Sequence, residues 1–168
     1  SSAASDVYKR QVWYAVQEKN KGGSIEAVRD WAEAHKLNLC HWFTVDDLHF
    51  LKRGGRVSAA TAVVGSMLQI KPVLHVDNEG HLINMGKARG RHASLTALVD
   101  HMEQTAIDPG AQTVFISHGD CLEEAERVAD DVRKRFGVKE IIINNVGPVI
   151  GAHSGPGTMA LFFMGRER

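Results

Sequence analysis

The sequence has 168 residues, of which 43% are hydrophobic and 24% are charged, and its formal net charge is zero. This composition suits a folded protein with one sizeable core, and a neutral chain has no overall field that attracts nucleic acid or anionic membranes. Two cysteines, Cys40 and Cys121, give no disulfide framework, and no apolar run approaches the ~20 residues that cross a bilayer. We therefore expect a cytoplasmic protein without a nucleic-acid partner and without stable membrane insertion.

The first 38 residues carry weak periodic signals. Residues 1–11 are polar and resemble an adapter-derived scar, so we expect a non-native or disordered tail there. Residues 12–38 are expected to be a helical segment. Within it, Ser24 is a predicted N-cap, and apolar residues recur at helical spacing from Ile25 to about His35.

A short strand and two helices are predicted next. Leu39 to Val45 reads as the strand, and a short helix after it should end at Gly54-Gly55. Ser58 is a predicted cap for a further helix over Ala59 to Leu68, which is rich in small and pliable residues. Such a helix either packs closely against a neighbour or lines a narrow apolar tunnel.

The remaining elements alternate between strands and helices. We predict strands at 73–76, 82–88, 113–117, 141–143 and 159–164, and helices at 92–106 and 121–136. The first two strands should form a hairpin, and Asp120 is a predicted cap for the last helix. Strand, helix and strand from 113 to 143 form one βαβ-like unit, which indicates an α/β fold with a partly parallel sheet.

The stretch between the last two strands is the richest in chemical detail. Gly147 to Thr158 contains four glycines, two prolines and one histidine, His153. Glycine permits close backbone approach, so amides in such a loop could face a ligand, with His153 as a titratable group beside them. The same pattern also fits a tight turn in which the histidine is incidental.

Three motifs follow one another along the chain: Val45-Asp-Asp-Leu-His-Phe-Leu-Lys-Arg-Gly-Gly-Arg-Val-Ser58, then Leu68-Gln-Ile-Lys-Pro-Val-Leu74 with Gly86-Lys-Ala-Arg-Gly90, and finally Gly151-Ala-His-Ser-Gly-Pro-Gly-Thr158. In their residues and their order they resemble the DegV family, whose members are bacterial fatty-acid-binding proteins of the EDD fold. The resemblance covers roughly residues 12 to 166. It implies that residues 39–168 form a DegV-like C-terminal domain, an α/β fold with a mixed sheet flanked by helices.

The resemblance also implies a function and a set of site residues. A long-chain fatty acid is the expected ligand, and its carboxylate is presented to a separate fatty acid kinase subunit for phosphorylation. His153, Ser154, Gly155 and Gly157 are then the expected carboxylate site, and Arg56 and Arg89 are expected to face the kinase or the phosphorylated head group. No cofactor, metal or catalytic residue is expected. From the residues alone, both arginines also fit solvated surface positions.

An enzyme is the alternative hypothesis, namely a hydrolase or acyltransferase that uses His153 as general base. It requires a nearby nucleophile and an orienting carboxylate. Ser154 adjoins His153, but neighbours in an extended segment point apart. Cys121 is predicted at a helix N-terminus, which favours a thiolate, but the charge of Asp120 opposes it. The sequence contains neither a Gly-x-Gly-x-x-Gly motif nor a Walker A motif, which argues against nucleotide binding by this chain.

One departure from the family pattern leads to a further expectation. Family members carry a preceding N-terminal domain with a Ser-Gly-Thr type motif that also contacts the carboxylate, and nothing in this sequence matches that motif. We therefore expect a C-terminal fragment, in which residues 12–38 are a remnant of the preceding domain. The segment before about Leu39 should pack poorly and leave apolar surface exposed.

Overall fold

The computed structural model describes residues 4–58 and 69–168. The described helices are α1 (Ala4–Asn20), α2 (Ile25–His35), α3 (Leu48–Arg53), α5 (Arg91–Thr105), α6 (Leu122–Phe136) and α7 (Pro148–Ser154), with a 3-10 turn η1 (Pro109–Ala111). The described strands are β1 (Leu39–Thr44), β2 (Ile70–Val76), β3 (Leu82–Arg89), β4 (Thr113–His118), β5 (Glu140–Asn145) and β6 (Met159–Met164). The helix expected over Ala59 to Leu68 lies outside the described residues.

The described strands form one mixed sheet in the order β3-β2-β1-β6-β4-β5. Strands β4 and β5 are parallel and joined through α6, which confirms the predicted βαβ unit. The other pairs, β1–β2, β1–β6, β2–β3 and β4–β6, are antiparallel. The expected α/β fold with a mixed sheet and flanking helices is therefore confirmed.

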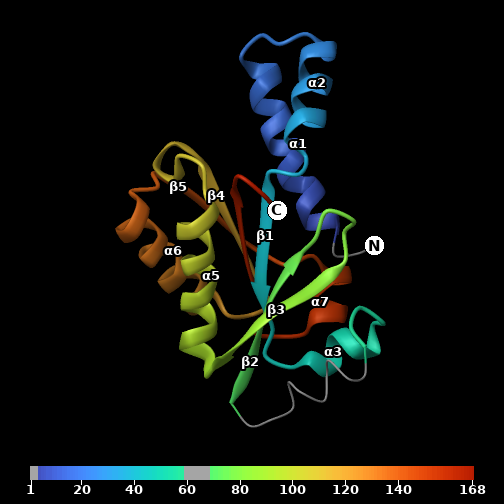
Figure 1. Ribbon diagram of the computed structural model, residues 1–168, viewed down its shortest axis with the longest axis vertical. Helices are drawn as coiled ribbons and strands as arrows, with labels where there is room; N and C mark the ends of the chain where they lie inside the picture. The colour runs from blue at the N-terminus through green and yellow to red at the C-terminus, as the bar shows by residue number, and fades with distance from the viewer. Residues whose placement is uncertain (1–3, 59–68) are drawn as a thin grey trace.

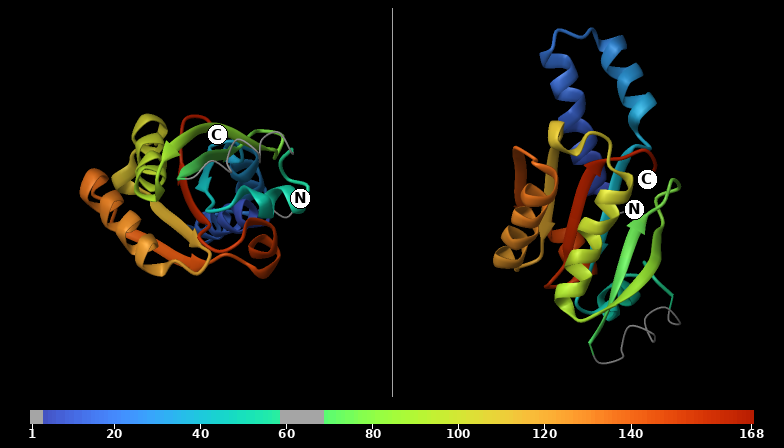
Figure 2. Two further views of the ribbon diagram at one scale, coloured as in Figure 1. Left: turned by 90° about the horizontal axis from the view of Figure 1, so that it is seen from below. Right: turned by 60° about the vertical axis from the view of Figure 1, so that its left-hand side comes forward.

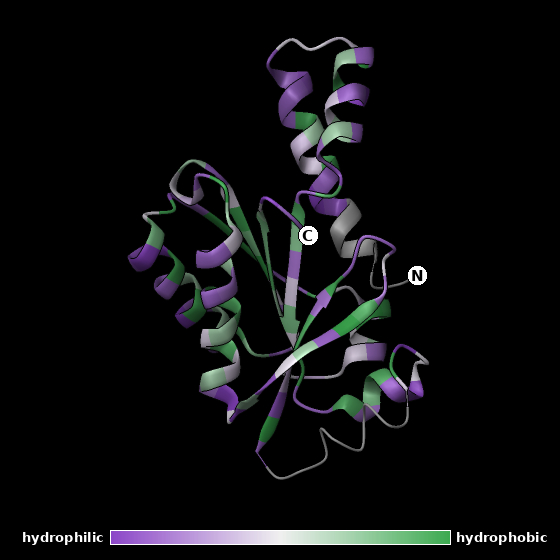
Figure 3. Ribbon diagram, in the orientation of Figure 1, coloured by the Kyte–Doolittle hydropathy of each residue, from purple (hydrophilic) through white to green (hydrophobic). Residues whose placement is uncertain are grey.

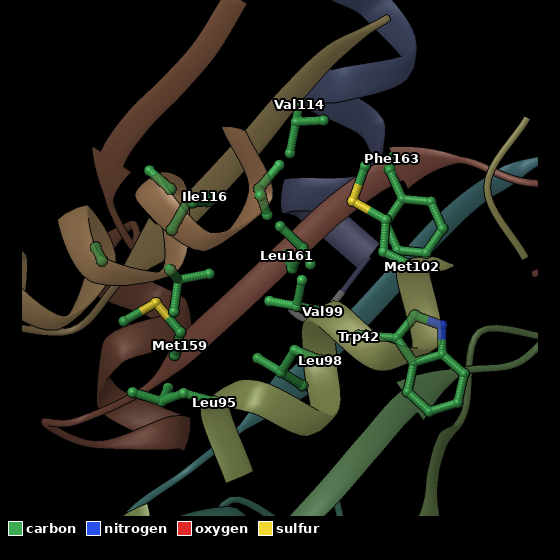
Figure 4. Packing of buried hydrophobic residues seen from close by; sticks show 14 of the residues in the cluster. Trp42, Leu95, Leu98, Val99, Met102, Val114, Ile116, Met159, Leu161 and Phe163 are labelled. Carbon is green, nitrogen blue, oxygen red and sulfur yellow. The ribbon is translucent and has the colours of Figure 1, made fainter. Parts of the chain in front are cut away.

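Each face of the sheet has its own hydrophobic core, because successive side chains of a strand point to opposite faces. Helices α5 and α6 cover one face, where Leu98, Met102 and Val128 pack against Trp42 and Leu161. Figure 4 shows this packing from close by, and Figures 1 and 2 show the two helices side by side. A fully buried side chain of this kind contributes about 1.5–3 kcal/mol of hydrophobic stabilisation, so this layer anchors the fold.

The opposite face carries helices α1, α3 and α7. Leu48 and Leu51 of α3 pack there with Phe43, Phe115 and residues of the neighbouring strands. Colouring by hydropathy shows that the strands in the middle of the molecule are mainly hydrophobic (Figure 3). Among the described residues, no helix is long and apolar enough to cross a membrane.

Helix α1 begins earlier than the sequence indicated. It runs without a break from Ala4 to Asn20, so it starts inside the stretch that we expected to be a tail. Arg10 is 7% exposed and donates a hydrogen bond of 2.7 Å to Ser117 Oγ, and the Tyr14 hydroxyl donates one of 2.8 Å to the Thr113 carbonyl. These bonds attach α1 to β4, and Arg10 is part of the fold.

Helix α2 matches its predicted position, with Ser24 as its N-cap. It has no buried residue, and together with the outer half of α1 it projects from one end of the molecule (Figure 1). The predicted cap of α6 is wrong. Its N-cap is Cys121, which makes no side-chain capping bond, whereas Asp120 precedes the helix in the left-handed conformation, at φ +55°.

Candidate functional site

The connection between β5 and β6 folds as helix α7, not as the irregular loop that its glycines and prolines suggested. Pro148 occupies the first turn, where its missing N–H does no harm. Gly155 ends the helix at φ +80°, a conformation that glycine adopts without strain. His153 therefore lies in the last turn of a short helix between the last two strands.

A narrow apolar pocket lies between this helix and the sheet, and its volume is about 40 Å³. Its apolar lining comes from Phe43, Leu51, Leu82, Val146, Ile150 and Ala160. Its polar lining comes from His41, Arg56, His153, Ser154 and Thr158. As the described residues build it, the pocket has room for a few water molecules at ~10–15 Å³ each, so a long ligand can enter only if its walls move apart.

The pocket depends on close contact between α7 and the end of α3. A Cβ atom on Gly54 would overlap the imidazole of His153, and one on Gly155 would lie 2.5 Å from the ring of Phe50. A Cβ atom on Gly157 would lie 2.6 Å from a carboxylate oxygen of Asp46. Glycine at these three positions lets the two motifs that contain them pack directly against each other.

The expectation of free amides beside His153 is wrong for the two glycines that we singled out. The Gly155 amide donates to the Gly151 carbonyl at 2.8 Å, and the Gly157 amide donates to the Gly119 carbonyl at 2.7 Å. The Ser154 hydroxyl donates to the Ile150 carbonyl at 2.9 Å. Because these donors are engaged within the fold, His153 is the stronger candidate among the four for holding a carboxylate.

The two arginines occupy different environments. Arg56 is half-buried, lines the pocket with His153, and donates a hydrogen bond from Nη1 to the Gly54 carbonyl. Arg89 is exposed at the end of β3 and is absent from the described residues that line the pocket. Their expected roles, including a shared surface patch, stay predictions.

Sequence reasoning missed His41, a pocket residue on the central strand β1. It is 7% exposed, and its ring stacks on Phe162 with centroids 4.3 Å apart. Burial, with the nearby positive charges of Arg168 and Arg10, lowers the pKa of His41 to about 3. The alternation of β1 could have placed His41 on the same face as Phe43, but which face holds the pocket depends on the tertiary fold.

The two side chains that the alternative hypothesis offers as nucleophiles both contact backbone carbonyls. The Ser154 hydroxyl donates to a backbone carbonyl, and Cys121 Sγ contacts the Thr158 carbonyl at 3.4 Å. Burial raises the pKa of the Cys121 thiol, which opposes formation of the nucleophilic thiolate. Among the described residues, the contacts of these two side chains do not include the hydrogen bond to His153 that the alternative hypothesis requires.

A mixed sheet with an apolar pocket on one face, whose lining includes His153 and Arg56, defines an α/β domain with a candidate ligand-binding site. The family described as "Uncharacterised protein, DegV family" matches residues 1–166, and the chain belongs to this family.

The known relatives share both sequence and fold. A DegV domain-containing protein of Clostridium perfringens is 49% identical over 154 residues, which are 92% of this chain and 53% of that protein. The solved structure of a fatty-acid-binding DegV family protein from Thermus thermophilus has a TM-score of 0.79 at 27% identity. It aligns over 94% of this chain and 56% of that one.

The fatty acid kinase (Fak) B3 protein of Streptococcus pneumoniae, solved with linoleic acid, has a TM-score of 0.83. At 19% identity over 92% of this chain and 54% of that one, this likeness shows the shared fold. The chain spans about half the length of the curated relatives it matches.

Proposed function

We propose that this chain belongs to a protein that binds a long-chain fatty acid and presents its carboxylate to a partner fatty acid kinase. The observation that carries the proposal is the apolar pocket with His153 and Arg56 in its wall. It is supported by the family membership and by the fatty acid binding of the Thermus thermophilus relative. The fold shared with the Fak B3 protein supports the kinase partner.

The apolar and the polar residues of the pocket would contribute differently to binding. Removing each methylene of an acyl chain from water is worth about 0.8 kcal/mol, so the apolar lining would supply most of the affinity. His153 would hydrogen-bond the carboxylate and fix its orientation, and Arg56 would add a positive charge nearby. In this proposal the protein binds and presents, and the kinase performs the phosphoryl transfer.

The partner surface is the second part of the proposal. Arg56 and Arg89 would contact the kinase or the phosphorylated head group, since a guanidinium binds phosphate oxygens in bidentate fashion. Because rim charges act mainly on the rate of encounter, reversing Arg89 to Glu should impair phosphorylation without loss of fatty acid binding.

The test is to replace His153 with Ala in the full-length protein and to extract and quantify copurified fatty acid by mass spectrometry. Losing a hydrogen bond to a charged group should weaken retention roughly tenfold or more, with little change in melting temperature. His92, which is exposed and does not line the pocket, provides the matched control His92→Ala. Normal retention and normal phosphorylation in His153→Ala would refute the proposal, and turnover of a chromogenic ester would favour the hydrolase instead.

A further inference from the structure

His41 is a polar side chain in the wall of an otherwise apolar stretch of the pocket. Its ring lies between two aromatic neighbours: it stacks on Phe162 and lies 5.2 Å from the ring of Phe43. Its Nδ1 atom is buried and has no hydrogen-bond partner among the residues that the structure describes. Buried polar atoms in folded proteins are paired as a rule, so an unpaired one at a pocket wall is informative.

The other pocket hydroxyls are already engaged. Ser154 Oγ donates to Ile150, and Thr158 Oγ1 donates to the Gly155 carbonyl at 2.8 Å. His41 differs from both because its buried Nδ1 has no partner among the described residues. Its ring is uncharged at neutral pH, with one nitrogen that donates and one that accepts. Such a ring can pair with a hydroxyl or a keto oxygen, whereas it offers a carboxylate no charge.

The position of His41 separates it from the candidate carboxylate site. His153 lies beside Gly54, beyond the end of β1 that leads into α3, and Phe43 is the last residue of β1 on the pocket face. His41 precedes Phe43 by two residues and points to the same face. Its Cα atom therefore lies about 7 Å farther from that end of the strand. A ligand whose carboxylate meets His153 would thus reach His41 with a carbon further along its chain.

We propose that His41 is a specificity-determining contact for an oxygen substituent along the acyl chain, so that the preferred ligands are hydroxy or keto fatty acids. This inference rests on the proposed fatty acid binding and narrows its ligand class. A plain acyl chain would leave His41 Nδ1 unpaired, whereas an oxygen at the matching carbon would pair with it.

The experiment compares octadecanoic acid with a series of hydroxyoctadecanoic acids that differ in the position of the hydroxyl group. Binding constants are measured by displacement on the delipidated full-length protein and on its His41→Phe variant. The protein should bind at least one hydroxyoctadecanoic isomer more tightly than octadecanoic acid. His41→Phe should lower the ratio of these two binding constants about tenfold, as expected for one buried hydrogen bond. Binding of octadecanoic acid itself should be retained.

Two further variants make the result specific. His75 has a buried Nδ1 without a partner among the described residues, and it stacks on Trp42 away from this pocket, so His75→Phe should leave the preference unchanged. His41→Gln keeps a donor and an acceptor and should retain part of the preference. A structure with the preferred isomer should place its oxygen within hydrogen-bond distance of the His41 ring.

The possible failures are distinguishable. If octadecanoic acid binds but no isomer is preferred, or if the preference survives His41→Phe, this inference is wrong and the proposed function stands. An ordered water on His41 that stays in place with every ligand also overturns it. If no fatty acid binds at all, both proposals fall.

Discussion

Gly54 is the residue at which the end of α3 packs against His153 of α7. Its backbone is in the ordinary helical region, at φ −74°, so glycine is not needed there for conformational freedom. It is needed for space, because the His153 imidazole occupies the position that a Cβ atom would take. Gly55 is the reverse case, with φ +68° and open space around it.

This contrast gives a matched pair of substitutions. Gly54→Ala should push the flexible His153 side chain aside and weaken fatty acid retention about as much as His153→Ala. Gly55→Ala should cost about 1–2 kcal/mol of stability, because an L-residue is strained in the left-handed region, and should leave retention intact. Lipid extraction and urea unfolding of both variants check this, and full retention in Gly54→Ala would contradict it.

His41 should also shape the acid stability of the protein. Its folded pKa of about 3 lies below the ordinary value near 6.5, so below pH ~6.5 the unfolded chain binds a proton that the folded protein does not. The free energy of unfolding should therefore decrease as the pH is lowered below about 6.5. The folding constant should fall by up to about tenfold for each pH unit, until the folded pKa is reached.

The measurement is the urea midpoint between about pH 6.5 and 4.5, above the range where most carboxylates titrate. His41→Phe should lose less stability than the unmodified protein over this window. The pKa values of His75 and His101 are also lowered by burial, so some acid sensitivity should remain in the variant. Parallel pH curves for the two proteins would show that His41 titrates normally.

At the scale of elements, α1 shows why part of this fold could not be read from the sequence. Residues 1–11 of the chain, in which the helix begins, are mostly polar, yet Arg10 is buried, with its guanidinium over the rings of Phe115 and Phe162. A residue type that is mostly exposed gives no local signal of burial. The strands at 113–118 and 159–164 were predictable because their apolar runs bury both faces.

Helix α7 is an element that sequence reasoning missed, although its signals were present. Proline at the first position and glycine after the last are the usual ends of a helix, but a seven-residue helix with an internal glycine shows too little periodicity to detect. The motif located His153 between the last strands and in the pocket. It could not reveal that Gly155 and Gly157 use their amides within the fold, because those bonds depend on tertiary contacts.

Helix α1 should contribute measurably to stability through its inner face. Trp13 makes edge-to-face contacts with Tyr14 and Phe115, at centroid distances of 5.0 and 5.2 Å. Because Trp13 is half-buried, Trp13→Ala should cost about 2–3 kcal/mol, somewhat below the value for a fully buried tryptophan. Val12 is 60% exposed, so Val12→Ala should stay within about 0.5 kcal/mol. Equal urea midpoints for the two variants would mean that α1 does not belong to the cooperative unit.

For the molecule as a whole, one cluster of exposed apolar side chains lies on the projecting α1–α2 hairpin. Val12, Val16 and Ile25 are 60%, 42% and 80% exposed, and with Ala15 and Val28 they line a groove between the two helices. The expectation that everything before Leu39 packs poorly is therefore too coarse. The inner face of α1 is bound to the sheet by Arg10 and Tyr14, and the uncovered apolar surface lies on the outer part.

This surface should bind a hydrophobic dye such as ANS, which reports incompletely buried apolar faces. The pocket beside His153 is a second place where dye could bind, and the dye signals from the pocket and the groove can be separated. Added fatty acid should displace dye from the pocket alone, while the double change Val12→Ser with Ile25→Ser should remove the fluorescence that fatty acid leaves behind. The double variant should keep its melting temperature, since both side chains are largely exposed. If fatty acid abolishes all dye fluorescence, or if the double variant fluoresces as strongly as the unmodified chain, the groove does not present apolar surface to the solvent.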